Sequence, residues 1–165
     1  MPEGVLHTLA AGRTDSATRR VVSPYLAGPA CASLWRMRSK QIRETPGDAA
    51  WVTRLIVDPA IVLPVGVAGF HGPPDADGMV EVGYRVDPMH RRQGYARRSL
   101  ETLLAVARAH PDVRTVRATI SPDNTASLAL IGRYGFVENG EQWDEEDGRE
   151  IIHEVSAERG GQSSD

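Results

Sequence analysis

Cysteine is nearly missing from this sequence, since Cys31 is the only one among its 165 residues. A single cysteine excludes an internal disulfide and any cysteine-rich metal cluster, and we expect no metal site. Its apolar neighbours favour a small buried side chain, because free cysteine is among the residue types most often found in protein cores. The chain is therefore expected to fold without covalent cross-links.

Long apolar runs are missing as well. The stretch from Ile61 to Ala68 is broken by Pro64 and Gly66, and it falls far short of the roughly 20 residues that cross a bilayer. The first residues lack a basic start followed by a continuous apolar stretch, so no secretory signal is expected. These absences predict a protein that is not associated with a membrane and that is cytoplasmic.

Composition and charge are those of an ordinary folded domain, with 41% hydrophobic residues, 25% charged residues and a net charge of -3. The length suits one domain, and no internal repeat or linker divides it. We expect residues 21–156 to form this domain. Residues 1–20 carry few apolar anchors and are expected to be a mobile segment, and the polar tail 157–165 is expected to be disordered.

The first half of the chain predicts one helix and three strands. Leu34, Met37 and Ile42 recur at roughly helical spacing within residues 29–43, which predicts a helix. Alternation and β-forming residues predict strands over 51–57, 65–71 and 79–86. The third strand would place one set of side chains on the core face and another on the opposite face, namely Val80, Val82, Tyr84 and Val86 against Glu81, Gly83 and Arg85.

The period changes in the second half. The apolar residues that recur at helical intervals after Gly94 are Ala96, Leu100, Leu103, Leu104 and Ala107. They predict a helix that ends near His110, before Pro111. A strand at 113–120, a helix that stops at Gly135 and strands at 136–137 and 150–155 follow. The expected fold class is α/β (α+β), with a mixed, mostly antiparallel sheet flanked by helices.

The most informative segment is the basic loop at residues 87–98, which joins the third strand to the next helix. Such a junction points backbone N–H groups and the positive helix end at one place, as a pyrophosphate requires. Gly94 lets a phosphate approach the backbone, and Ala96 is too small to block it. Arginines at positions 91, 92, 97 and 98 add positive charge.

Two common nucleotide-binding loops are excluded, because the chain contains neither G-x-x-x-x-G-K-[ST] nor a G-x-G-x-x-G in this region. Two other interpretations of the basic loop stay open. It could be an exposed turn whose arginines are solvated, or a nucleic-acid-binding patch. The net negative charge of the chain argues against the patch, so no nucleic-acid partner is expected.

The sequence RRQGYA from Arg91 to Ala96 fits the Q/R-x-x-G-x-G/A signature of the GNAT superfamily of acyl-CoA N-acyltransferases, and a V-D-P strand ending precedes it. Further along, Asn124 to Ser127 and the pair Gly135-Phe136 match the N-x-x-S/A helix and the closing G-F of that family. The ordered pair of motifs resembles this superfamily over roughly residues 51–155. It is most similar to the branch that includes the ribosomal-protein N-terminal alanine acetyltransferases.

The resemblance implies a single GNAT-like domain that uses acetyl-CoA as acyl donor. Backbone N–H groups from Arg92 to Arg97 would hold the pyrophosphate, and residues 84–86 would lie along the pantetheine arm as a pseudo-strand. Asn124 would contact this arm, and it also suits a helix N-cap. The predicted cofactor-binding set is Tyr84, Arg85, Val86, Arg91, Arg92, Gln93, Gly94, Tyr95, Ala96, Arg97 and Asn124.

Acetyl transfer from a thioester needs a neutral amine, a donor for the developing oxyanion and a proton for the thiolate. The resemblance implies a backbone N–H near Tyr84 or Arg85 as the oxyanion donor. Glu81 is the candidate base, directly or through water, and its alternative role is a solvated strand carboxylate. Ser127 is the candidate acid, with a bound water as substitute and simple helix packing as the alternative role.

The tyrosine that many family members use as the acid is missing, because Ile131 stands seven residues after Asn124. Tyr134 lies about 300° further around the helix, so the role is not transferred to it and a core position is the alternative. A thiolate with a pKa near ~8.5 is a tolerable leaving group without strong acid help. A non-catalytic module that senses acyl-CoA stays open as the alternative function.

The acceptor is expected to be a primary amine of a small molecule or of a peptide or protein N-terminus. An acidic loop containing Glu138, Glu141 and residues 144–147 favours a cationic amine or a peptide N-terminus, and a solvated turn is the alternative. Homodimers are frequent in families of this kind, so a homodimer is expected. Candidates for the opposite wall of the acceptor cleft are Trp35, Arg36 and Arg38, with core packing as the alternative for Trp35.

Overall fold

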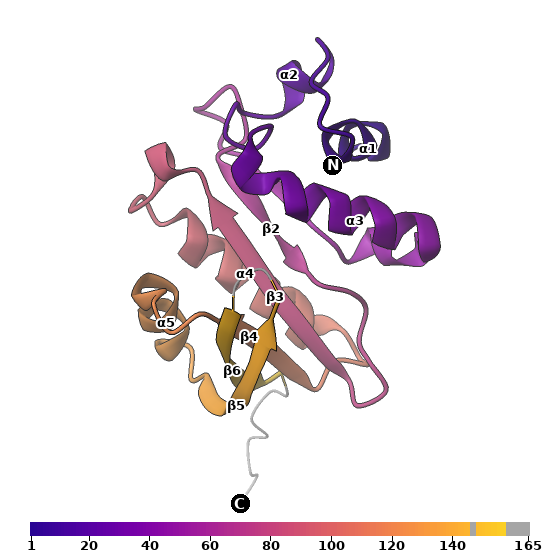
Figure 1. The fold of residues 1–165 in the computed structure, drawn as a ribbon. Helices are drawn as coiled ribbons and strands as arrows, with labels where there is room; N and C mark the ends of the chain where they lie inside the picture. The colour runs from indigo at the N-terminus through magenta and orange to yellow at the C-terminus, as the bar shows by residue number, and fades with distance from the viewer. Residues whose placement is uncertain (146–147, 158–165) are drawn as a thin grey trace, which may run out of the picture. The chain divides into compact units, whose positions relative to one another are not determined.

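Figure 1 shows the computed structural model of the chain, which describes residues 1–145 and 148–157. Within these residues the strands join in one six-stranded sheet of order β1-β2-β3-β4-β6-β5. The strands are β1 (Arg54–Ile56), β2 (Gly66–Phe70), β3 (Met79–Val86), β4 (Thr115–Ile120), β5 (Val137–Asp144) and β6 (Gly148–Ser156). β3 and β4 are parallel, whereas the pairs β1–β2, β4–β6 and β5–β6 are antiparallel. The expected mixed, mostly antiparallel sheet is confirmed.

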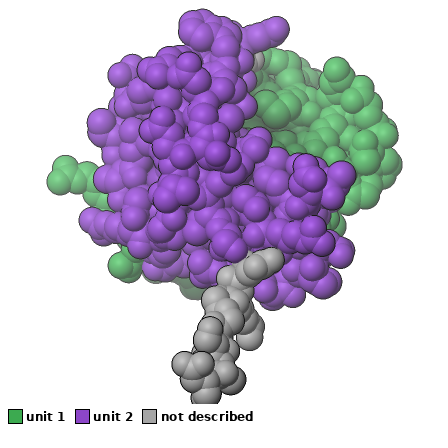
Figure 2. Space-filling view, turned by 90° about the horizontal axis from the view of Figure 1, so that it is seen from below, with its two compact units in different colours: residues 1–72, 83–100 green, residues 73–82, 101–165 purple. Residues whose placement is uncertain are grey.

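The chain divides into two compact units, which Figure 2 colours separately. The first unit contains residues 1–72 and 83–100, and the second contains residues 73–82 and 101–165. The division falls within β3 and within α4 (Tyr95–Ala109). The basic loop at 87–98 therefore lies entirely in the first unit, whereas Glu81, Asn124 and Ser127 lie in the second.

The core of the first unit forms where α3 (Ala32–Glu44) packs with α1 (Glu3–Ala10) and with β2. Trp35 of α3 is at the centre of this core, with 1% of its surface exposed. Its indole Nε1 donates a hydrogen bond of 2.6 Å to the carbonyl of Leu26. A buried indole needs such an acceptor, because an unsatisfied N–H inside a core is destabilising. The predicted helix over 29–43 corresponds to the 3-10 turn Pro29–Cys31 followed by α3.

The N-terminal segment, whose mobility stays a prediction, contains α1 and α2 (Thr18–Val21) in the structure. Leu6 and Leu9 of α1 are buried in the same core as Trp35, and Figure 1 shows α1 beside α3. The sequence pattern did not predict α1, because so short an apolar stripe gives a weak periodic signal.

The second unit shows the alternation that the sequence predicts for β4. Val116, Ala118 and Ile120 are buried, whereas Thr115, Arg117 and Thr119 are half-buried. The helix α5 (Thr125–Gly132) follows, and Asn124 is its N-cap, since its Oδ1 accepts a hydrogen bond from the Ser127 N–H at 3.2 Å.

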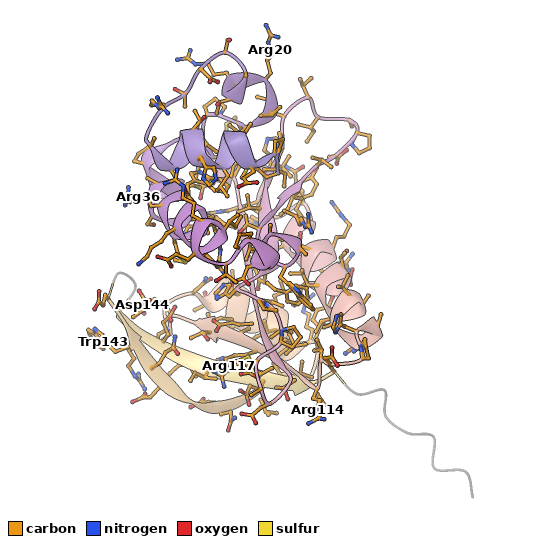
Figure 3. All side chains as sticks on the ribbon, turned by 90° about the vertical axis from the view of Figure 1, so that its right-hand side faces the viewer. Arg20, Arg36, Arg114, Arg117, Trp143 and Asp144 are labelled. Carbon is orange, nitrogen blue, oxygen red and sulfur yellow. The ribbon has the colours of Figure 1, made fainter. Side chains whose placement is uncertain are left out.

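The acidic segment after Phe136 is a strand through most of its length, which corrects the prediction of an acidic loop. Glu138, Glu141 and Asp144 lie in β5, and residues 146–147 lie outside the described part of the chain. Glu141 pairs with Arg149 of β6 at 2.7 Å. The sequence pattern does not predict most of this strand, because Glu, Asn and Gly are depleted in strands. In the structure, pairing with β6 overrides that propensity. Figure 3 shows Trp143 and Asp144 at the end of β5.

The described chain ends with Ala157, which is buried and whose N–H donates to the Arg114 carbonyl at 2.8 Å. This residue is therefore packed rather than part of a disordered tail, and the predicted tail from 158 onward lies outside the described residues. None of the helices in the described ranges combines the length and apolarity needed to cross a membrane.

Candidate acetyl-CoA and acceptor site

The loop after β3 begins from a fixed strand end. Asp87 is buried, and its backbone N–H donates to the Val65 carbonyl at 2.8 Å. Its carboxylate accepts a hydrogen bond of 3.0 Å from the Met89 N–H, which caps the short 3-10 turn that follows. Arg91 Nε donates to the Val86 carbonyl at 3.3 Å. These contacts lie in the first unit and hold the beginning of the predicted phosphate loop in place.

Arg92 and Gly94 give the loop its shape. Both have positive φ angles, 62° and 82°, and Arg92 is the one non-glycine residue with such an angle in the part of the chain that the structure describes. A residue held in this sparsely populated region costs about 1–3 kcal/mol and is often found at ligand sites. Left-handed residues in a loop also turn successive N–H groups toward one side, which forms a concavity that binds anions.

The helix α4 begins at Tyr95, directly after Gly94. The N–H groups of its first turn have no helical acceptor, and the helix dipole adds partial positive charge there. A Cβ built on Gly94 would lie 3.0 Å from Arg98 Nη1, so the approach to the loop is both narrow and cationic. These donors fit a pyrophosphate. Arg98 was not in the predicted set, although its position one turn into the helix could have indicated it.

The side chain of Tyr95 anchors the loop. The ring is buried with Val65 and Val86, and the hydroxyl donates to Asp58 Oδ2 at 2.7 Å. Arg98 covers the ring, with its guanidinium carbon 4.7 Å from the ring centroid. No local pattern in the sequence indicates Asp58 as a partner, because it lies far from Tyr95 along the chain.

The hydrogen bond between Tyr95 and Asp58 shifts the pKa of both groups. It lowers the pKa of the Asp58 carboxyl below its ordinary value, with the Ala60 N–H as a further cause. The same hydrogen bond is the main cause that raises the pKa of the Tyr95 hydroxyl above its ordinary value. The anchor is therefore a neutral phenol donating to an ionised carboxylate around neutral pH.

A pocket of about 150 Å³ lies beside the C-terminal half of β3. Its apolar walls include Leu34, Val67 and Phe70, and β3 contributes Gly83, Tyr84 and Arg85. His71 lies so close that a Cβ on Gly83 would come within 2.7 Å of its Nε2. The predicted residues Tyr84 and Arg85 thus meet residues of β2 and α3 that the sequence did not connect with them.

Two arginines line this pocket. Arg38 is 5% exposed, and its Nη1 donates to the His71 carbonyl at 3.0 Å and to Gln41 Oε1 at 2.7 Å. Gln41 Nε2 also donates to the His71 carbonyl at 2.8 Å, so the end of β2 is tied to α3. Arg85 is exposed, and its Nη1 donates to the Ala30 carbonyl.

The three side chains predicted for the opposite wall of the acceptor cleft have different positions. Arg38 lines the pocket beside β3, and its role in an acceptor cleft stays a prediction. Trp35 is a core residue, because its indole is buried and bonded to Leu26. Arg36 is exposed and points away from α3, as Figure 3 shows. The three side chains therefore face the pocket, the core and the solvent, because residues of one helix point in different directions around its axis.

In the second unit, Glu81 lies opposite Arg117 in the β3–β4 register, and Arg117 lies opposite Glu154. Arg117 donates to Glu154 Oε1 through Nε at 2.9 Å and through Nη2 at 2.7 Å. A carboxylate, a guanidinium and a second carboxylate thus occupy successive strands at one level of the sheet. The catalytic role of Glu81 stays a prediction.

The two residues near the missing acid position also lie in the second unit. Ile131 is 1% exposed and belongs to the core. The Tyr134 hydroxyl donates to Glu101 Oε1 at 2.7 Å, and the side chain is half-buried rather than fully in the core. Ser127 is half-buried, and its role as acid stays a prediction.

The described residues contain no group of three His, Cys, Asp or Glu side chains that could hold a metal ion. The lone Cys31 is buried, as expected, and this burial is the main cause that raises the pKa of its thiol.

The class of the protein follows from the fold and from a comparison with protein families. Residues 6–137 match the family model described as the acetyltransferase (GNAT) domain. The chain therefore belongs to the GNAT acetyltransferase family.

Individual relatives agree with this assignment. The uncharacterized N-acetyltransferase YjdG of Bacillus subtilis is 35% identical over 75 residues, which are 46% of this chain and 45% of that protein. This chain thus spans about half the length of the curated relatives that it matches. A chimera built from the Vibrio cholerae spermidine N-acetyltransferase SpeG and hSSAT has a TM-score of 0.67 at 15% identity, covering 95% of this chain and 92% of that one. A GNAT-family acetyltransferase from Streptococcus pneumoniae has a TM-score of 0.57 at 15% identity, covering 74% and 75%. At such identities these structures show a shared fold.

Proposed function

We propose that this protein is an N-acetyltransferase that moves the acetyl group of acetyl-CoA directly onto a primary amine of a small molecule or of a peptide or protein N-terminus. The observation that carries this proposal is the loop with positive φ angles at Arg92 and Gly94, which ends at the N-terminus of α4. Membership of the GNAT family supports it. The branch of ribosomal-protein alanine acetyltransferases and the homodimer remain proposals from the resemblance. The cytoplasmic location remains a proposal from the sequence pattern.

In this proposal the loop binds the donor. Backbone N–H groups from Arg92 to Arg97 hold the pyrophosphate, and the Arg98 guanidinium adds charge beside Gly94. The segment 84–86 lies along the pantetheine arm, and Asn124 contacts the same arm. The side chain of Tyr95 keeps the helix start in place through Asp58.

The chemistry needs one bond to form and one to break. The neutral amine attacks the thioester carbon, the carbon–sulfur bond breaks, and a backbone N–H near Tyr84 or Arg85 stabilises the developing oxyanion. Glu81 takes the proton that the amine nitrogen loses, directly or through water. Ser127 or a water supplies the proton to the departing thiolate.

A second candidate function is an acyl-CoA sensor without turnover. The observation that favours it is the burial of Ile131, because a buried aliphatic side chain at the usual acid position supplies no proton. Tyr134 is not a ready substitute, since its hydroxyl already donates to Glu101.

Calorimetric titration with acetyl-CoA, with CoA and ATP as controls, and a free-thiol assay on the same sample test both functions. The amine panel includes short peptides and spermidine, the acceptor named for a structural neighbour. Binding with thiol release supports the enzyme, binding without release on every amine supports the sensor, and absence of binding contradicts both.

Replacing Glu81 by glutamine tests the base. We expect Glu81→Gln to lower kcat by about 100-fold or more, as loss of a general base commonly does, with unchanged acetyl-CoA affinity. The matched control is Glu44→Gln, an exposed carboxylate at the end of α3. An unchanged rate across the pH range would remove Glu81 from the mechanism.

A further inference from the structure

We infer that the acceptor amine carries a carboxylate or another anionic group, and that Arg38 and Arg85 select it in the pocket beside β3. The inference rests on the proposed acetyltransferase function and deepens it, because it names a class of acceptor. It differs from the cationic amine that the acidic residues of the sequence favoured.

The charge of the pocket is the first argument. Its lining contains Arg38, Arg85 and His71 and, in the part of the chain that the structure describes, no aspartate or glutamate. Glu81 lies in the second unit and is not part of this lining, so the lining residues themselves carry an excess of positive charge. Such a surface attracts an anion and disfavours a second ammonium group.

The fixed position of both guanidinium groups is the second argument. Arg38 donates to Gln41 and to the His71 carbonyl, and Arg85 donates to the Ala30 carbonyl. The Ala30 carbonyl is neutral, so it orients Arg85 without removing its charge. Arginine in a fixed orientation binds a carboxylate well, because its planar fork matches the two oxygens.

The size of the pocket is the third argument. A volume of about 150 Å³ is smaller than the several hundred Å³ that drug-sized ligands occupy. It suits one end of a molecule or a small molecule with short apolar contacts to Leu34, Val67 and Phe70. An anionic group held at one arginine would leave the amine at a short distance from it.

The experiment compares acceptors that differ only in charge away from the amine. One set is γ-aminobutyrate, its amide and putrescine, which carry a negative, a neutral and a positive far end. The other set is glycylglycine and its amide. The ratio of kcat/KM for each carboxylate to that for its amide is measured with the thiol assay at saturating acetyl-CoA, and acetyl-CoA binding is measured separately by calorimetry.

We expect the carboxylate to be preferred in at least one set by roughly tenfold, the usual effect of one charge-assisted hydrogen bond. Arg85→Gln should reduce this preference toward one through a higher KM, and Arg85→Lys should retain part of it. Arg38→Gln should also reduce the preference for the carboxylate over the amide. Because Arg38 is buried, its variant counts only if its melting temperature stays near that of the unmodified protein; Arg85 is exposed and needs no such condition.

The matched control is Arg36→Gln, which removes an exposed arginine on the outer side of the same helix. This variant should keep the preference of the unmodified protein. A preference for the amides or for putrescine, or an equal loss in Arg36→Gln, would overturn the inference and leave the acetyltransferase intact. Loss of acetyl-CoA affinity in Arg85→Gln would also overturn it, because the arginine would then serve the donor. Failure of the unmodified protein to bind acetyl-CoA would instead contradict the proposed function.

Discussion

Replacing Gly94 by alanine tests the phosphate loop through the conformation of one residue. Gly94 has a φ of 82°, a region in which a residue with a Cβ is strained by about 1–2 kcal/mol. The added Cβ would also lie 3.0 Å from Arg98 Nη1. That atom ends a flexible side chain and moves at little cost, so the backbone strain is the larger effect.

The strain in Gly94→Ala can lower either the stability of the folded protein or its affinity for acetyl-CoA. If the loop keeps its conformation, the folded state loses about 1–2 kcal/mol, which lowers the melting temperature by about 2–8 °C in a domain of this size. If the loop relaxes to a negative φ, stability is retained and the conformation that binds the anion must be restored on binding. The affinity for acetyl-CoA would then fall by a factor of about 5–30. The two losses should sum to about 1–2 kcal/mol.

Calorimetric titration of the variant measures its affinity for acetyl-CoA, and thermal unfolding of the same sample measures its stability. Gly12→Ala is the matched control, since Gly12 has a φ of 67° at the end of α1 and no atom within 4 Å of an added Cβ. It should lose stability to a similar extent and keep its affinity for acetyl-CoA. If Gly94→Ala kept both its melting temperature and its affinity, the assignment of the loop would be refuted.

Three further predictions concern the anchor, the core and the lone cysteine. Tyr95→Phe removes the hydrogen bond to Asp58, and the melting temperature should fall relative to the unmodified protein between about pH 4 and pH 10. This difference in melting temperature should vanish at lower pH, as pH falls through the lowered pKa of Asp58, and at higher pH, as pH rises through the raised pKa of Tyr95. A difference in melting temperature that persists at both extremes would contradict the role of the pair. Trp35→Phe leaves the buried Leu26 carbonyl without its indole donor and should cost about 1–3 kcal/mol in chemical denaturation, whereas a loss well below 1 kcal/mol would show that a water replaces the donor. Cys31 should react slowly with a thiol reagent near neutral pH until denaturant is added, because burial raises its pKa, and fast labelling of the folded protein would contradict its core position.

Local sequence chemistry was enough to predict much of the fold. The strand β3 and the helix α4 have strong apolar periods, and both appear in the structure close to the expected residues. Asn124 marks the start of α5 because capping depends on the residue itself and on its immediate neighbours. The predicted stop at Gly135 is too late, since α5 ends at Gly132 and Gly135, with a φ of 77°, lies in the turn that follows. The strand β5 was mostly missed, since its charged residues are held by pairing with β6.

A short sequence motif was enough to predict the donor half of the candidate site. A phosphate loop is made from consecutive residues, so its glycine, its arginines and the start of its helix are visible as one short motif. The structure added the conformation of Arg92 and the anchor between Tyr95 and Asp58, which join residues that are distant along the chain.

The candidate acceptor pocket of the first unit could not be predicted from the sequence. Arg38 and His71 reach the pocket from a helix and from the end of a strand, and no local pattern relates them to Arg85. Trp35 and Arg36 are neighbours in the sequence, yet one lies in the core and the other faces outward. A pocket built from separate elements depends on how those elements pack, and packing is a property of the whole folded unit rather than of any one segment.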